Sequence, residues 1–213
     1  ISVLEVFLPL SAGAQVVIAG SEDIIDGTML SRLINKHGIT VMQATPATWN
    51  LLIAEGWDGN KNLKALCGGE AMPVTLIREL LPRVKELWNM YGPTETTVWS
   101  TCYCITDAEA PIVVGKPIDN TTIHIIDRHN KYLPAGVTGE VAIGGKGVTK
   151  GYHNRPELTA EKFIRFVDKG IIYKTGDQGR YQHDGNIELL GRIDNQIKLR
   201  GFRIEPGEIE TLL

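Results

Sequence analysis

Apolar positions in the first half of the chain alternate between two spacings. Met29, Leu30, Leu33 and Ile34 recur at the period of an amphipathic helix, whereas Ile39–Met42 is a short continuous apolar run. Helices are predicted at about residues 29–34, 45–52 and 73–81, and strands at residues 15–19, 39–42, 63–67 and 84–90. Alternation of strands with helices indicates parallel pairing, so the expected fold class is α/β, with a largely parallel sheet and flanking helices.

The pattern changes after Pro111. Short strand-like runs are now separated by turn residues, and Asp184-Gly185-Asn186 is typical of a hairpin turn. Strands are predicted at residues 112–114, 122–127, 140–143, 171–174 and 186–190, a spacing typical of a small antiparallel β-barrel. Charged residues become dense beyond Gly191, which predicts a hinge near Asp194. The expected parts are residues 1–110 (sheet), 111–191 (barrel) and 192–213 (hinge and the start of a truncated C-terminal α+β subdomain).

Composition narrows the function classes. The 213 residues include 22 Lys and Arg against 25 Asp and Glu, a net charge of −3. No strongly basic field is available for nucleic acid or an anionic membrane, so neither is expected as a partner. The chain has three cysteines, which favours a reducing, cytoplasmic setting over a disulfide scaffold. Cys102 and Cys104 are interpreted as packing residues of a strand.

Candidate chemistry begins at the sequence YGPTETT, residues 91–97, which follows a predicted strand. Ligands of open α/β sheets bind at strand ends. The Gly92-Pro93 turn leaves backbone N–H groups and threonine hydroxyls available to an anion, and Glu95 beside them suits a Mg²⁺ site shared with phosphate. A sharp polar turn without a ligand is the alternative.

Other strand ends are less specific. Paired glycines at Gly68 and Gly69 allow close approach of a ligand but are equally compatible with a tight turn. Asp177 after a predicted strand could bind ribose hydroxyls, although an Asp beside Gly is by itself more often a turn residue. The glycines of residues 144–147 are interpreted as a structural turn, because no Walker or Rossmann pattern surrounds them.

Four stretches together resemble one known family. They are NMYGPTETT (residues 89–97), GEVAIGGKGVTKGYHNRPELT (139–159), YKTGDQGRY (173–181) and GRIDNQIKLRGFRIEPGEIE (191–210). In this order they are similar to the adenylation domains of nonribosomal peptide synthetases, within the wider acyl-adenylate-forming superfamily. The resemblance implies a large subdomain of sheets with a distorted barrel, joined by a hinge to a small C-terminal subdomain.

It also implies an activity. The family activates a carboxylate with ATP and Mg²⁺, releases pyrophosphate, and passes the acyl group to a phosphopantetheine thiol. The expected partners are a small amino acid, a peptidyl-carrier domain and neighbouring synthetase domains of the same chain.

Site residues follow from the matched motifs. By resemblance, Thr94 contacts phosphate, Glu95 binds the metal, Asp194 is the hinge residue, and Lys198, with Gly201, lies in the loop brought to the pantetheine tunnel. The resemblance further implies a nucleotide site formed by Gly69, Glu70, Ala71, Asn89, Tyr91, Gly92, Thr94, Asp177 and Arg192.

The amino-acid pocket is also implied by the resemblance. Its matching positions are Ile1, Leu4, Gln43, Leu66, Gly68, Met90, Val98 and Trp99. Large side chains at most of these positions would leave little room, which favours glycine or another very small amino acid, with alanine as the next choice. Without the resemblance, the same apolar residues would be interpreted as core.

Two other functions stay open. One is an acyl- or aryl-CoA synthetase of the same superfamily, and the other is a noncatalytic fragment that only binds a partner. The family's phosphate loop would lie upstream of Ile1, its catalytic lysine downstream of Leu213, and its Asp for the substrate amino group just before Ile1. We therefore expect residues 1–213 to be an internal fragment that is inactive alone.

Overall fold

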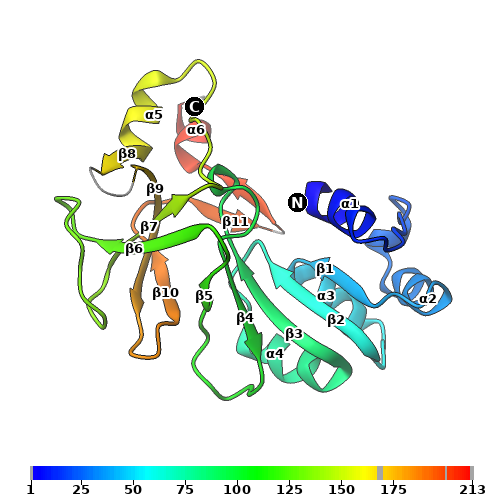
Figure 1. Cartoon of the computed structure of the whole chain (residues 1–213). Helices are drawn as coiled ribbons and strands as arrows, with labels where there is room; N and C mark the ends of the chain where they lie inside the picture. Colours follow the sequence, from blue (N-terminus) through cyan, green and yellow to red (C-terminus); the bar gives the residue numbers. More distant parts are fainter. Residues whose placement is uncertain (1, 167–169, 200, 212–213) are drawn as a thin grey trace. The chain divides into compact units, whose positions relative to one another are not determined.

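The structure is a computed structural model that describes residues 2–166, 170–199 and 201–211 (Figure 1). It contains two compact units. Unit 1 comprises the described residues up to Asn89 together with Cys104–Pro111, and unit 2 comprises Met90–Tyr103 and the described residues from Ile112 onward. The subdomain boundaries expected at residues 110 and 191 stay predictions.

Unit 1 is built from helices and strands in alternation. Its helices are α1 (Ser2–Ser11), α2 (Gly27–Lys36), α3 (Pro46–Ala54) and α4 (Val74–Leu80), with 3₁₀ turns η1 (Asp23–Ile25) and η2 (Leu81–Arg83). Its strands are β1 (Val41–Ala44), β2 (Asn60–Gly68) and β3 (Val84–Tyr91), whose last two residues belong to unit 2. β1 pairs with β2 in parallel, which confirms the α/β expectation.

The local sequence explains where these helices begin. The Asp26 carboxylate accepts a 2.9 Å hydrogen bond from the Met29 N–H and caps α2. Pro46 occupies the first turn of α3, where its missing N–H costs nothing. Both helices bury apolar side chains in a core that is fully buried at Trp49, Leu52, Leu63, Leu76, Leu80 and Leu87. Burial of these side chains is the main source of stability in unit 1.

Two predicted strands are wrong. Residues 15–19 form no strand in the described structure, and Ile18 is 85% exposed. Residues 112–114 are buried at Val113 and Val114, yet the strand here is β5 (Lys116–Pro117). An apolar run indicates burial or extension, but it does not reveal whether a neighbouring backbone is available for pairing.

Unit 2 contains the antiparallel region. β6 (Thr121–Ile126), β7 (Gly139–Gly145), β9 (Gly170–Tyr181) and β10 (Ile187–Arg192) form a sheet in the order β10-β9-β7-β6, and β8 (Phe163–Phe166) pairs with β9. The sheet is curled into half a barrel, as expected for the antiparallel region. Its core contains Tyr91, Val114, Ile123, Ile125, Val141, Ile143 and Ile187.

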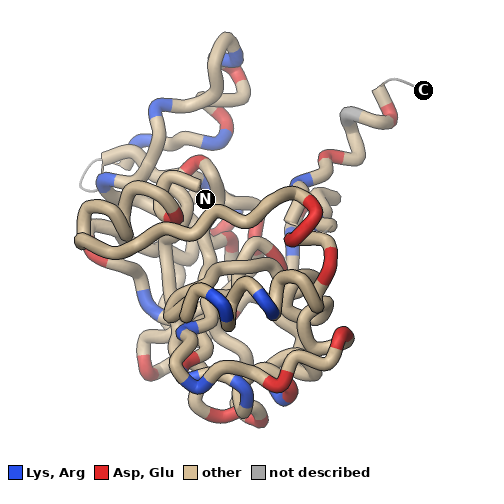
Figure 2. The backbone as a smooth tube through the Cα atoms, turned by 90° about the vertical axis from the view of Figure 1, so that its right-hand side faces the viewer, with Lys and Arg blue, Asp and Glu red and all other residues tan. Residues whose placement is uncertain are grey.

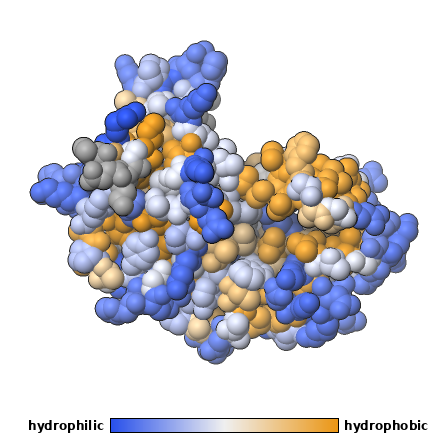
Figure 3. All heavy atoms as spheres, viewed as in Figure 1, coloured by the Kyte–Doolittle hydropathy of each residue, from blue (hydrophilic) through white to orange (hydrophobic). Residues whose placement is uncertain are grey.

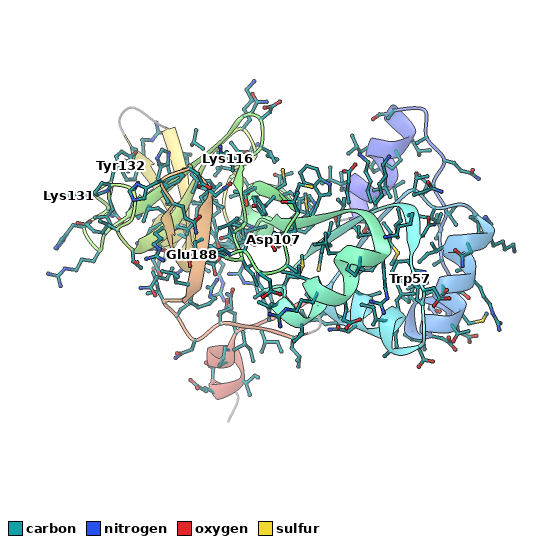
Figure 4. The ribbon with its side chains drawn as sticks, turned by 90° about the horizontal axis from the view of Figure 1, so that it is seen from below. Trp57, Asp107, Lys116, Lys131, Tyr132 and Glu188 are labelled. Carbon is teal, nitrogen blue, oxygen red and sulfur yellow. The ribbon has the colours of Figure 1, made fainter. Side chains whose placement is uncertain are left out.

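Three shorter features of unit 2 complete the frame of the site. The 3₁₀ turn η3 (Thr94–Thr96) precedes β4 (Thr101–Ile105), whose first residues pair with β5. Helix α5 (Pro156–Lys162) leads into β8, and a hairpin of β11 (Ile197–Leu199) and β12 (Phe202–Ile204) precedes α6 (Pro206–Glu210). Figure 4 shows Lys131 and Tyr132 on the turn after β6, and Glu188 on β10.

The surface carries both polar and apolar regions. Lys and Arg alternate with Asp and Glu along much of the described backbone (Figure 2). Apolar atoms gather over α1 in Figure 3, where the exposed residues are Val3, Phe7, Leu8 and Leu10. Within the described ranges, every helix is too short or too polar to cross a bilayer.

Candidate functional site

The turn after β3 is closed by its own backbone. The Ser100 N–H donates to the Tyr91 carbonyl at 2.8 Å, and the hydroxyls of Thr96 and Ser100 are 2.6 Å apart. Gly92 is needed here because a Cβ would come within 2.5 Å of the Val98 carbonyl oxygen. Residues 91–100 therefore form a compact loop that presents η3 at the end of β3.

Strain is stored at the far side of this loop. Thr97 and Val98 both have positive φ, 64° and 68°, which is unfavourable for β-branched residues. The Thr97 hydroxyl donates to the Gly147 carbonyl at 2.7 Å, and the Thr149 N–H donates to the Glu95 carbonyl at 2.9 Å. Segment 147–149 thus holds the loop in a conformation that it would not adopt alone. Such strain is most often found at functional sites.

Glu95 lies at the centre of a first network. Its carboxylate is buried, with 6% of the residue exposed. Oε1 accepts hydrogen bonds from the Tyr152 hydroxyl at 2.6 Å and from the Arg203 guanidinium at 2.7 Å. Oε2 is buried and has no hydrogen-bond partner among the described residues. A buried carboxylate oxygen without a partner is costly unless something else binds it.

Charge favours the ionised form of this carboxyl. Burial acts to raise the pKa of Glu95, but the Tyr152 hydrogen bond and the positive charge of Arg203 outweigh it, so the pKa lies below its ordinary value. An ionised carboxylate with a spare oxygen is a hard ligand of the kind that Mg²⁺ prefers, usually together with substrate phosphates. Glu95 therefore fits the metal role predicted for it.

A second network surrounds Asp177 on β9. Oδ2 accepts from the Tyr91 hydroxyl at 2.6 Å, and Oδ1 accepts from Arg192 at 2.8 Å. The same guanidinium makes two bonds of 2.6 Å to Asp194, one to each carboxylate oxygen. Asp177 and Arg192 are register partners on β9 and β10, so the antiparallel pairing itself brings them together.

Gly176 makes the Asp194 contact possible. Its φ is 73°, and a Cβ would come within 2.5 Å of Asp194 Oδ2 and 2.7 Å of the Arg192 guanidinium. In this network burial opposes ionisation, but the bonds to Arg192 lower the pKa of Asp194, and the bonds to Asp194 and the charge of Asp177 raise the pKa of Arg192. The hinge residue predicted from sequence is thus an ion-pair partner of the predicted nucleotide residues.

Burial also fixes the state of Tyr91. Desolvation, and then the neighbouring Asp177 charge, raise the pKa of its phenol well above the ordinary value. Tyr91 therefore remains a hydrogen-bond donor to Asp177 at neutral pH. Each oxygen of Asp177 keeps a lone pair after accepting one bond, so the carboxylate retains capacity for the hydroxyls of a ribose.

The remaining predicted residues of unit 2 are placed around the loop and hairpin. Thr94 is exposed, Met90 and Val98 are half-buried, and Trp99 is buried. Lys198 is exposed on β11, opposite Arg203 of β12. Their contacts with substrate and carrier stay predictions.

Unit 1 holds the other predicted site residues. Gln43 on β1 and Leu66 on β2 are register partners, and Gly68 ends β2. Gly69 has a φ of 88°, which requires glycine, and its neighbours Glu70 and Ala71 lie in the following loop. Asn89 is buried near the end of β3, and Leu4 is half-buried on α1. Ile1 lies outside the described residues.

Sequence reasoning missed the two hydrogen-bond donors to Glu95, Tyr152 and Arg203, and the neighbour of Tyr152, Tyr173. Tyr152, Tyr173 and Arg203 each lie within a stretch that carried the family resemblance, but nothing in the sequence paired them with Glu95. The Tyr152 and Tyr173 hydroxyls are 3.5 Å apart. For the two tyrosines, the available sequence signal was an aromatic residue near glycines; it did not indicate a contact with Glu95.

Comparisons with known proteins identify the family of the chain. A family model described as AMP-binding enzyme matches residues 1–153. The dimodular nonribosomal peptide synthase of Bacillus subtilis (strain 168) is 43% identical over 217 residues, covering 100% of this chain and 9% of its own length. Tyrocidine synthase 3 of Brevibacillus parabrevis is 44% identical over 216 residues, covering 98% of this chain and 3% of its own length.

Solved structures give the same result. The crystal structure of AB3403, a four-domain nonribosomal peptide synthetase bound to AMP and glycine, matches with a TM-score of 0.87 and 46% identity. That match covers 100% of this chain and 16% of the other. PA1221, a synthetase protein containing adenylation and PCP domains, matches with a TM-score of 0.78 at 30% identity, over 88% of this chain and 34% of its own. This chain therefore spans only a small part of the proteins it resembles.

Proposed function

The chain belongs to the family of AMP-binding enzymes, and from this premise we propose that it is part of an adenylation domain of a nonribosomal peptide synthetase. The reaction joins an amino-acid carboxylate to the α-phosphate of ATP, which gives an aminoacyl-adenylate and pyrophosphate. The acyl group then passes to the phosphopantetheine thiol of a peptidyl-carrier domain. PA1221, with its adenylation and PCP domains, supports the carrier as partner.

One observation carries the proposal. Glu95 is a buried carboxylate whose Oε2 has no hydrogen-bond partner among the residues that the structure describes, and it directly follows the exposed Thr94 of a closed, strained loop. Mg²⁺ bound there would neutralise phosphate charge during transfer. Such catalysis depends on positioning and electrostatics, with no covalent role for the protein.

The roles of the chain's own residues follow. Thr94 would contact phosphate, and Asp177 would accept the ribose hydroxyls with Tyr91 and Arg192 holding its carboxylate. Gly69, Glu70, Ala71, Asn89 and Gly92 would complete the nucleotide site. Asp194 would act at the hinge, and Lys198 on the hairpin would approach the pantetheine.

We propose glycine, or another very small amino acid, as substrate. AB3403, which is 46% identical to this chain, was solved with bound glycine, and this supports the choice. The bulky Trp99 and Met90, with Leu4 and Leu66, would leave little space, and each extra methylene would cost about 1–3 kcal/mol. Free cysteines at 67, 102 and 104 fit a cytoplasmic setting.

ATP–pyrophosphate exchange in the full-length protein tests the proposal, with glycine, alanine, a bulky aliphatic amino acid and an aryl acid compared side by side. Exchange strongest with glycine is expected. Exchange with the aryl acid alone would favour a CoA synthetase, and exchange with no acid would favour a noncatalytic binding role.

A further inference from the structure

Tyr152 is the uncharged hydrogen-bond partner of Glu95. Its hydrogen bond to Glu95 and its ring contact with Phe163 both restrict the position of its hydroxyl. The hydroxyl donates to Glu95 Oε1 at 2.6 Å, across 57 residues of sequence. Its ring packs edge-on against Phe163 at a centroid distance of 5.5 Å, and Phe163 in turn contacts Tyr173 at 5.1 Å. A phenol that packs edge-on against a neighbouring ring and donates a hydrogen bond at its far end has fewer rotamers available.

The backbone of Tyr152 is also fixed. Its N–H donates to the Thr159 hydroxyl at 2.9 Å, and that hydroxyl donates to the Arg155 carbonyl at 2.8 Å. Gly151, with a φ of 122°, passes so close to Thr159 that a Cβ would lie 2.3 Å from its methyl group. Helix α5 therefore anchors the residue that holds Glu95.

The consequence for Glu95 lies in its two oxygens. Tyr152 and Arg203 both donate to Oε1, whereas Oε2 is buried and accepts no hydrogen bond from the described part of the chain. Arg203 comes from the β11–β12 hairpin with 37% of its side chain exposed, so solvent weakens its ion pair with Glu95, whereas Tyr152 is half-buried and packs against the Phe163 ring. A carboxylate held through one oxygen turns the other in a fixed direction.

We propose that Tyr152 is a positioning residue for the metal carboxylate: it holds Glu95 Oε1 so that Oε2 is directed at Mg²⁺. The inference rests on the proposed function, because it requires Glu95 to be the metal ligand. In this proposal Tyr152 acts only through its hydrogen bond to Glu95.

The test combines metal binding with kinetics in the full-length protein. Mn²⁺ affinity is measured by electron paramagnetic resonance with a nonhydrolysable ATP analogue, against a baseline of analogue alone. ATP–pyrophosphate exchange is then measured over a range of Mg²⁺ concentrations. The variants are Y152F, E95Q and Y181F, and the last is a matched control because the Tyr181 hydroxyl donates a 2.9 Å bond to the Ile123 carbonyl elsewhere in unit 2.

For Y152F we expect about tenfold weaker Mn²⁺ binding and about tenfold more Mg²⁺ at half-maximal exchange, since one charge-assisted hydrogen bond is lost. Its maximal rate at saturating Mg²⁺ should stay within about twofold of wild type, because the ligand itself remains. Y181F should match wild type in both measurements.

Thr159→Val is a second variant that keeps the phenol but removes the hydroxyl bonded to the Tyr152 N–H. A twofold to threefold rise in the Mg²⁺ requirement is expected. This variant decides the question if thermal unfolding shows that Y152F does not fold.

Three results would overturn the inference. Unchanged Mn²⁺ affinity in Y152F, with weakened affinity in E95Q, would remove the role of Tyr152 and leave Glu95 as ligand. Unchanged affinity in both variants would instead remove the metal role of Glu95 itself. A collapse of the maximal rate in Y152F at unaltered Mn²⁺ affinity would assign the tyrosine another task.

Discussion

Glu95 and Asp177 are two buried carboxylates of unit 2 that receive the same kinds of partner. Each accepts one bond from a tyrosine hydroxyl and one from an arginine. In the Asp177 network the two donors bind different oxygens, and Arg192 continues to Asp194. In the Glu95 network both donors share Oε1, so Oε2 is left buried and unpartnered.

Asp177 thus uses both of its oxygens in bonds that stabilise the fold, whereas Glu95 keeps one oxygen for a ligand. Pairing both oxygens of Asp177 stabilises the folded state and links the interior of β9 to Arg192, the last residue of β10. Leaving one oxygen of Glu95 unpaired costs stability, and the cost is tolerated where a ligand recovers it. The Asp177 network should therefore respond to mutation mainly in stability, and the Glu95 network mainly in activity.

The largest effect is expected for E95Q. An amide cannot supply the anionic oxygen that Mg²⁺ prefers, so exchange should fall about a hundredfold or more at physiological Mg²⁺. The free energy of unfolding should fall less than in D177N, because the Arg203 partner of Oε1 is more exposed to solvent than Arg192 and Oε2 has no hydrogen bond to a described residue. The matched control is E188Q on β10, where Glu188 pairs with Arg180. An equal fall in exchange in E95Q and E188Q would contradict the special role given to Glu95 in this comparison.

D177N should reduce the free energy of unfolding more than E95Q does, and exchange activity less. The amide leaves the half-buried Arg192 with a weaker partner, so the free energy of unfolding should drop by about 2–3 kcal/mol in urea titrations. The KM for ATP should also rise. D184N, in an exposed turn, serves as the control. A D177N protein as stable as wild type would contradict the structural role given to this network.

R203A should sharpen the contrast by changing the charge at Glu95 alone. Removing the guanidinium from Oε1 leaves the carboxylate's negative charge fully available to a cation, so the Mg²⁺ concentration at half-maximal exchange should fall about threefold. R180A removes a comparable ion pair on the β9–β10 hairpin and should leave this value unchanged. An increased Mg²⁺ requirement in R203A would mean that Arg203 supports metal binding.

The smallest effect is expected in the pH dependence of the free energy of unfolding at acidic pH. Because the folded pKa of Glu95 is lowered, its stabilising contribution is present above its ordinary pKa of 4.5 and is lost as pH falls through the lower folded value. E95Q should therefore flatten the dependence of unfolding free energy on pH below about 4.5. If the curves of unfolding free energy against pH were parallel for wild type and E95Q, the Glu95 carboxyl would have the same pKa in the folded and unfolded states, which would contradict this prediction.

Sequence reasoning proposed Glu95 and Asp177 as ligands but did not predict the hydrogen-bond networks around them. Glu95 follows the end of β3, as predicted, but Asp177 was wrongly expected to follow a strand and lies inside β9, because the strand continues through the Gly176 turn signal to Tyr181. Tyr152 and Arg203 reach Glu95 across 57 and 108 residues, and no periodicity or turn signal encodes such a contact. The same limit explains the strands at residues 15–19 and 112–114, since pairing depends on a neighbour that the run itself does not specify.

Anomalous diffraction from Mn²⁺, in crystals of the full-length protein with an ATP analogue, tests the central claim most directly. The account predicts a metal about 2.0–2.2 Å from Glu95 Oε2, with the Tyr152 hydroxyl still on Oε1. A metal bound only by phosphates, or by a different carboxylate, would contradict it.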